Sequence, residues 1–111
     1  MLIEFPDERT QELFNSVKEL ARAFGPENAK LTRRRLDDLR SCVTLVVARG
    51  IPGKLEELKG RRKGQFSMRL VGAFRLIFIS SQQPAPVKAD GGIDWAQVRA
   101  ITVLQVEDYH D

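Results

Sequence analysis

Hydrophobic residues in the first half of the chain recur at helical spacing. One stripe, at three- and four-residue steps after Pro6 and Asp7, predicts a single helix and consists of Leu13, Phe14, Val17, Leu20, Ala21 and Phe24. Gly25 and Pro26 end this helix, because glycine suits a left-handed cap and proline cannot continue it. A second helix, with or without a break, is predicted from about residue 27 to residue 49, and its buried side holds Leu31, Leu36, Leu39 and Val43. Together they predict an antiparallel helical hairpin.

The second half of the chain has the period of two that is typical of strands. Apolar and polar residues alternate over residues 65–70, residues 71–73 can reverse the chain, and residues 74–79 alternate again. The second of these strands is apolar on both faces near Ile77 and Phe78, which predicts a central position in the sheet. Residues 2–5 predict an edge strand, residues 80–92 a mobile loop, and roughly residues 95–106 a last strand.

The predicted fold class is therefore α+β, with an N-terminal helical hairpin packed on one face of a small, mainly antiparallel sheet. A chain of 111 residues forms one domain, residues 1–111. Its 30% charged and 42% hydrophobic residues exclude a disordered tail, and apolar runs such as residues 43–48 are too short to cross a bilayer. We therefore expect that the protein does not act at a membrane.

Cysteine and histidine usage indicates the compartment and the metal content. The single cysteine, Cys42, excludes an internal disulfide, and we expect it to be an ordinary buried side chain. The opening residues lack the basic and apolar regions of a signal peptide, so a cytoplasmic protein is expected. One cysteine and one histidine, without ligand spacing, predict no metal site and no cofactor.

The net charge of +3 hides an uneven distribution along the chain. Residues 58–89 hold seven basic and no acidic residues, which leaves 11 basic and 15 acidic residues, a net charge of −4, on the remainder. The seven basic residues are Lys59, Arg61, Arg62, Lys63, Arg69, Arg75 and Lys88. A slightly basic total therefore conceals one concentrated cationic segment, which favours an anionic ligand at one place on the surface.

Two arginines of this segment are predicted to pair on one face of the sheet. In a hairpin that turns near Gly72, Arg69 and Arg75 lie roughly opposite each other and point away from the apolar face. Like charges in that position repel unless an anion lies between them, and a phosphate matches the planar fork of arginine. The loop with Lys59, Arg61, Arg62 and Lys63 adds positive charge beside them.

A simpler interpretation remains open for these charges. They can form a solvated surface pair and a charged turn, partly neutralised by Glu56 or Glu57. The other basic run, residues 33–35, precedes Asp37 and Asp38 and is predicted to be structural or partner-facing, because those acids lie three or four residues away on a helix.

The chain closes on three residues that carry candidate chemistry, Asp108, Tyr109 and His110. Tyrosine can stack on a nucleobase, and aspartate or histidine can transfer a proton near neutral pH. Together with phosphate-binding arginines, these groups fit RNA cleavage by the substrate's own 2′-hydroxyl, which needs a base, an acid and positive charge on the phosphoryl oxygens.

These residues resemble the HigB branch of the RelE/ParE toxin superfamily. The resemblance rests on the stretches LKGRRKGQ (residues 58–65), FRLIF (residues 74–78) and VEDYH (residues 106–110), in that order, and on residues 29–40. It covers most of the chain and implies the toxin of a type II toxin–antitoxin system. Such toxins are mRNA interferases, endoribonucleases that cut mRNA in the ribosomal A site, and their fold is a small antiparallel sheet with helices on one face.

The resemblance also implies roles and partners. Lys59 and Arg62 belong to the basic loop, Arg75 holds the scissile phosphate, and Asp108, Tyr109 and His110 form the C-terminal part of the site. The family pattern has a histidine where this chain has Glu56, which can itself serve as a base if its pKa is raised. The implied partners are mRNA, the ribosome and a HigA-like helix-turn-helix antitoxin, with operator DNA reached only through that antitoxin.

Two other functions remain open at this point. ParE-type relatives inhibit DNA gyrase and lack the acid–base residues. A basic face can also bind RNA or an acidic protein without chemistry, in which case binding depends strongly on salt and no cleavage occurs.

Overall fold

The computed structural model describes residues 1–109 as an α+β fold. Its five-stranded sheet has the order β1-β5-β4-β3-β2. The strands are β1 (Leu2–Glu4), β2 (Glu56–Glu57), β3 (Gln65–Arg69), β4 (Phe74–Ser80) and β5 (Ala100–Asp108). The β1–β5 pair is parallel and the other pairs are antiparallel. The predicted α+β class, the edge strand at residues 2–5 and the central position of β4 are confirmed.

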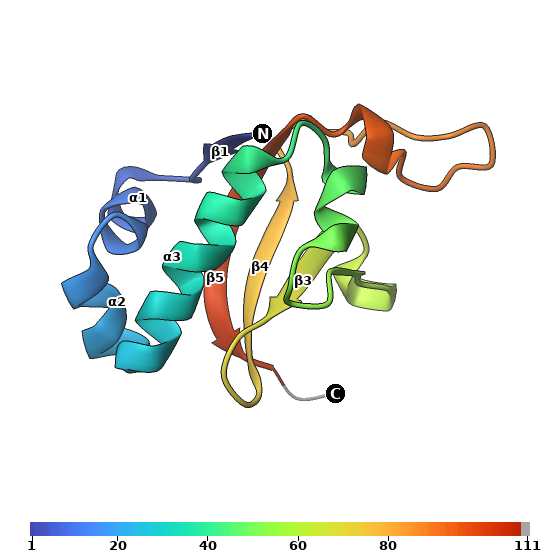
Figure 1. Ribbon diagram of the computed structural model, residues 1–111. Helices are drawn as coiled ribbons and strands as arrows, with labels where there is room; N and C mark the ends of the chain where they lie inside the picture. The colour runs from blue at the N-terminus through green and yellow to red at the C-terminus, as the bar shows by residue number, and fades with distance from the viewer. Residues whose placement is uncertain (110–111) are drawn as a thin grey trace.

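Three α-helices lie on one side of this sheet (Figure 1). They are α1 (Glu8–Phe14), α2 (Val17–Phe24) and α3 (Pro26–Ser41), and 3-10 turns follow at Leu45–Gly50, Gly60–Arg62 and Trp95–Gln97. The core between helices and sheet contains Phe14, Leu20, Leu36, Leu39, Phe66, Met68, Leu76 and Phe78, each at most 1% exposed. Within residues 1–109, no helix is long and apolar enough to cross a membrane.

The prediction of one helix before Gly25 is wrong, because two short helices occupy that stretch. Asn15 ends α1, and the Ser16 hydroxyl caps α2 by accepting a hydrogen bond from the Glu19 N–H at 3.1 Å. A side-chain cap competes with helix continuation at serine, and Val17 is consequently 51% exposed instead of buried. Gly25 and Pro26 separate α2 from α3 as predicted.

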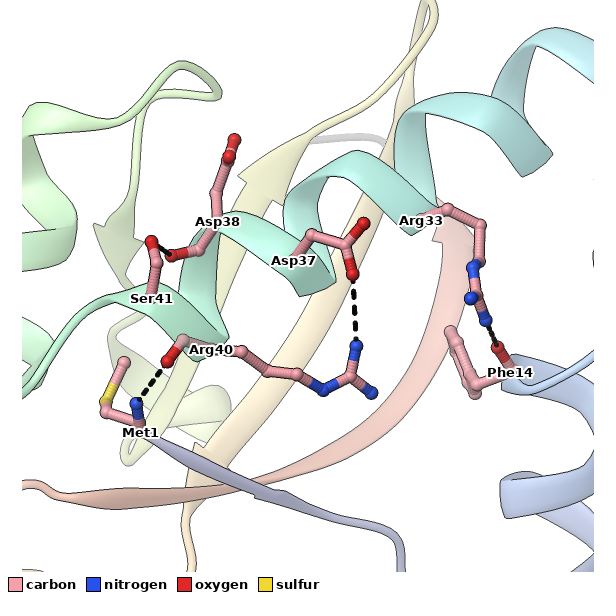
Figure 2. Close-up of polar contacts among 7 residues, drawn as sticks. All are labelled: Met1, Phe14, Arg33, Asp37, Asp38, Arg40 and Ser41. Carbon is pink, nitrogen blue, oxygen red and sulfur yellow. Dashed lines mark hydrogen bonds and ion pairs between the residues drawn. The ribbon is translucent and has the colours of Figure 1, made fainter.

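Helix α3 is the central element of the helical layer and anchors its neighbours through polar side chains. Arg33 donates to the Phe14 carbonyl at the end of α1 at 3.2 Å, and Arg40 pairs with Asp37 at 3.3 Å (Figure 2). The Met1 amino group donates to the Arg40 carbonyl at 3.0 Å, near the negative end of the α3 dipole (Figure 2). The Arg33 contact agrees with a structural role for the basic run at residues 33–35, but the ion pair of Asp37 is with Arg40 and not with the arginines of that run.

Three further details differ from the predictions. Val43 lies past the end of α3 and is 69% exposed, so it is not part of the buried side. The last strand begins at Ala100 instead of residue 95, because Asp94 caps a 3-10 turn by accepting from the Ala96 N–H at 3.2 Å. The two-residue strand β2 was not predicted, because so short an edge strand shows no alternation. Cys42 is buried, as predicted.

Candidate functional site: a basic sheet face

The face of the sheet opposite α3, which we call the open face, carries the predicted cationic pair. Arg69 of β3 lies directly opposite Arg75 of β4, as predicted, and Arg75 lies directly opposite Glu107 of β5. Strand alternation and the register place the following residues on this face: Gln65, Ser67, Arg69, Arg75, Ile77, Ile79, Thr102, Gln105 and Glu107. Arg69, Arg75 and Glu107 therefore form one row across three strands, which we call the arginine row.

The hairpin that carries the two arginines is fixed to the helical layer by buried polar side chains. Asn28 of α3 is 5% exposed and accepts a hydrogen bond from the Val71 N–H at 2.9 Å. Arg35 of α3 is 7% exposed, and its Nε donates to the Arg69 carbonyl at 3.2 Å. On the other side, the Arg69 N–H donates to the Gly53 carbonyl at 2.6 Å. The backbone of Arg69 is thus held from both sides, which limits the movement of the Cα atom that carries its side chain.

The two arginines of the row differ in how much of the guanidinium is engaged. Arg75 is half-buried, and its Nη1 donates to the carbonyls of Gly72 at 2.9 Å and Phe74 at 2.8 Å. Those bonds use one of its three nitrogens and leave Nε and Nη2 without a partner among residues 1–109. Arg69 is exposed, and its side chain has no hydrogen bond or ion pair in that same part of the chain.

A second cluster lies beside the row and is centred on Arg62, a residue of the basic loop. Its Nη1 donates to Glu107 Oε2 at 2.9 Å, its Nη2 pairs with Glu107 Oε1, and its Nε donates to Gln65 Oε1 at 3.0 Å. The Arg62 guanidinium also lies 5.2 Å from the centroid of the Tyr109 ring, within cation–π range. We call Arg62, Gln65, Glu107 and Tyr109 the Arg62 cluster.

The Arg62 side chain crosses the centre of the open face. Gln65 and Glu107 belong to two rows of the sheet that are separated by the row containing Ile77. Ile77 is fully buried although it points away from the core, which agrees with a side chain lying across it. The hydrogen bonds from Arg62 hold the pKa of the Glu107 carboxyl below its ordinary value, and Glu107 in turn raises the pKa of Arg62.

The end of β5 brings Tyr109 to the arginine hairpin. The Tyr109 N–H donates to the Ala73 carbonyl at 2.9 Å, next to the turn between Arg69 and Arg75. Alternation along β5 places Glu107 and Tyr109 on the open face, whereas Asp108 lies opposite Phe74 on the helix side of the sheet. His110, the third residue of this motif, lies outside the described residues.

The other predicted site residues occupy the edge of the open face. Lys59, Arg61 and Lys63 are exposed, and none of them has an ion pair within residues 1–109. Glu56 of β2 lies opposite Ser67 and so belongs to the open face, where it pairs with Lys54 at 3.5 Å. Glu57 lies on the other face and accepts from Trp95 Nε1 at 2.7 Å.

The sequence interpretation missed Glu107 as a member of the site and treated Arg62 as a free ligand-binding cation. Strand alternation was the signal that could have identified Glu107, because Glu107 is two residues from Tyr109 and therefore lies on the same face of the strand. Arg62 and Glu107 are 45 residues apart, and sequence alone does not pair them.

Comparison with family models, with curated proteins and with solved structures finds no match for this chain. Among residues 1–109, no group of three or more histidine, cysteine, aspartate or glutamate side chains lies close enough to hold a metal ion. The groups that the open face offers to a ligand are its cations, its carboxylates and Tyr109.

Proposed function

We propose that this chain is the toxin of a type II toxin–antitoxin pair, a ribosome-dependent endonuclease that cuts mRNA. The observation that carries the proposal is the direct pairing of Arg69 with Arg75 on the open face. Two like charges in register cost stability in a sheet, so their presence favours an anion between them. Tyr109, hydrogen-bonded beside the same turn, supplies an aromatic ring next to that anion.

In the proposed reaction, the 2′-hydroxyl oxygen of the RNA attacks the adjacent phosphorus and the bond to the 5′-oxygen breaks. A base takes the 2′-hydroxyl proton, and an acid gives a proton to the departing 5′-oxygen. Arg75 and Arg69 stabilise the negative charge that develops on the phosphoryl oxygens. The HigB resemblance offers His110, Asp108 and Glu56 for the proton transfers. Asp108 lies on the helix side of the sheet, away from the arginine row, so we assign the transfers to His110 and Glu56.

The proposed role also defines partners and place of action. The toxin acts on ribosome-bound mRNA in the bacterial cytoplasm, and a helix-turn-helix antitoxin neutralises it and alone connects it to operator DNA. The concentration of basic residues within residues 58–89, on a remainder with a net charge of −4, supports a local RNA site over general coating of nucleic acid.

The decisive experiment measures mRNA cleavage on purified ribosomes. The wild-type protein should cut, and Arg75→Ala and His110→Ala should each reduce the rate by about two orders of magnitude or more, as loss of charge stabilisation or acid–base catalysis does. Arg22→Ala serves as the control, because Arg22 lies on α2 in an exposed ion pair with Glu19. Intact mRNA with the wild-type protein, together with normal growth of cells that express it, would refute the proposal.

A non-enzymatic function is the second candidate, and the position of Glu56 favours it. Glu56 replaces the family histidine and is engaged with Lys54 at the sheet edge. A ParE-like protein would inhibit supercoiling by DNA gyrase, whereas a binding module would retain RNA in a salt-dependent way without cutting it. A supercoiling assay and an RNA-binding titration on the same preparation separate these functions from the endonuclease.

A further inference from the structure

The open face continues beyond the arginine row into a groove of about 500 Å³. Ile79 of β4 and Leu104 of β5 line its apolar part. Leu104 is the extra residue of a β-bulge, since Ile77 pairs with Gln105 and Phe78 pairs with Val103. The loop at residues 81–94, which projects from the sheet (Figure 1, orange), forms one wall, and the residues around Lys63 form the other.

The lining of this groove combines apolar surface with amides and positive charge. Gln65 and Gln83 contribute side-chain amides, Lys63 contributes a cation, and no lining residue is acidic. The Gln83 side chain is fixed by a hydrogen bond from its Nε2 to the Ser80 carbonyl at 2.8 Å, which leaves its Oε1 as an acceptor. Apolar surface and amides held by hydrogen bonds, beside a cation, match the face, the edge and the phosphate of a nucleotide.

The groove is connected to the proposed phosphate site through Gln65. That residue lines the groove and also accepts a hydrogen bond from Arg62, which bonds Glu107 of the arginine row. Gln65 lies four residues from Arg69 along β3, roughly 13 Å at about 3.3 Å per residue. A stacked strand rises about 3.4 Å per nucleotide, so at most about four nucleotides separate the two places.

We propose that this groove binds one nucleobase of the same RNA strand whose phosphate lies on the arginine row. The apolar part packs against the face of the base, and Gln65 and Gln83 hydrogen-bond its edge. The inference rests on the proposed function, because it takes a single strand of RNA as the ligand. It assigns base preference to the groove, at a fixed distance from the cleaved bond.

The test uses ribosomes programmed with synthetic mRNAs in which one nucleotide at a time is abasic. For the wild-type protein, cleavage should fall about tenfold at one position, as expected for the loss of one stacked base, and much less elsewhere. Ala85→Trp fills the groove, because Ala85 lines it, and should lower cleavage of intact mRNA and abolish the effect of that abasic position. Ala89→Trp is the matched control, because Ala89 is exposed on the same loop but does not line the groove.

The outcomes separate the inference from the function on which it rests. A flat abasic profile for a wild-type protein whose cleavage depends on Arg75 would overturn the groove and leave the endonuclease intact. An abasic profile of Ala85→Trp that equals the wild-type profile would likewise overturn the groove and leave the endonuclease intact. Absence of cleavage with every mRNA would overturn both.

Discussion

Arg62 and Glu107, 45 residues apart in the chain, form a bidentate ion pair across the open face. Gln105 Nε2 also donates to this carboxylate, at 2.8 Å, and Arg75 lies opposite it in the sheet. A carboxylate held by an arginine fork and an amide resembles, in charge and shape, a bound phosphate oxygen pair. Under the proposed function, Glu107 therefore engages the Arg62 guanidinium, a cation that an RNA phosphate would otherwise bind, and RNA would have to compete with this carboxylate.

Removal of the Glu107 charge is expected to strengthen RNA binding. In Glu107→Gln the Arg62 guanidinium becomes available to a phosphate, so affinity should rise severalfold at low salt. The slope of log K against log salt concentration should steepen by about one unit, because one more cation displaces counterions. Asp37→Asn, which removes an equal charge from an exposed pair on α3, is the control. Weaker binding by Glu107→Gln would show instead that Glu107 orients Arg62 for the ligand.

The same pair predicts how stability depends on pH. The pKa of Glu107 is lowered in the folded protein, chiefly by its hydrogen bonds with Arg62, so the pair stabilises fully above the unfolded pKa of about 4.3. That contribution is lost as the pH falls through the lower, folded value. The free energy of unfolding of the wild-type protein should exceed that of Glu107→Gln by about 1.5–3 kcal/mol at pH 7, the range for hydrogen bonds to charged groups. At pH 2 the two free energies should be nearly equal. Urea unfolding at both pH values measures this difference, and an equal gap at both would contradict it.

Substitution of Arg69 is expected to change stability and activity in opposite directions. Its side chain has no ion pair or hydrogen bond among residues 1–109 and faces the like charge of Arg75. Arg69→Gln should leave the free energy of unfolding unchanged or raise it by about 0.2–1 kcal/mol, while mRNA cleavage and RNA affinity both fall. Arg34→Gln, an exposed position on α3, controls for net charge. A clear loss of stability in Arg69→Gln would indicate that the arginine has a structural role instead.

The parts of the fold that could be predicted are those that local pattern determines. The three-residue reversal at residues 71–73 fixes the hairpin register, so the Arg69–Arg75 pair follows from counting residues. The division between α1 and α2 did not follow, because apolar spacing continues through Ser16 while its hydroxyl caps a new helix. The late start of β5 was missed for the same reason at Asp94. Side-chain caps, which leave periodicity intact, account for both errors.

The candidate site divides in a similar way. Residues that share one hairpin, such as Arg69 and Arg75, were placed by alternation alone. The Arg62–Glu107 pair and the clamps from Asn28 and Arg35 join segments 34 to 45 residues apart, and only tertiary packing brings them together. Tyr109 was identified by its chemistry, but its place beside Arg62 depends on how far β5 extends.

Gly53 provides the sharpest test of the clamp that holds Arg69. Its φ of +118° lies in the region that favours glycine, and a Cβ there would lie 2.7 Å from Arg35 Nε, the atom that donates to the Arg69 carbonyl. Gly53→Ala should therefore lower the free energy of unfolding by about 1–3 kcal/mol, which corresponds to a Tm lower by roughly 4–8 °C for each kcal/mol. The variant should also be less active than the wild-type protein at temperatures below its Tm, where it is still folded. Gly50→Ala is the matched control, because its Cβ would meet nothing within 4 Å and its φ is ordinary. If both variants unfold at the wild-type temperature, the contact between residues 53 and 35 does not fix the hairpin.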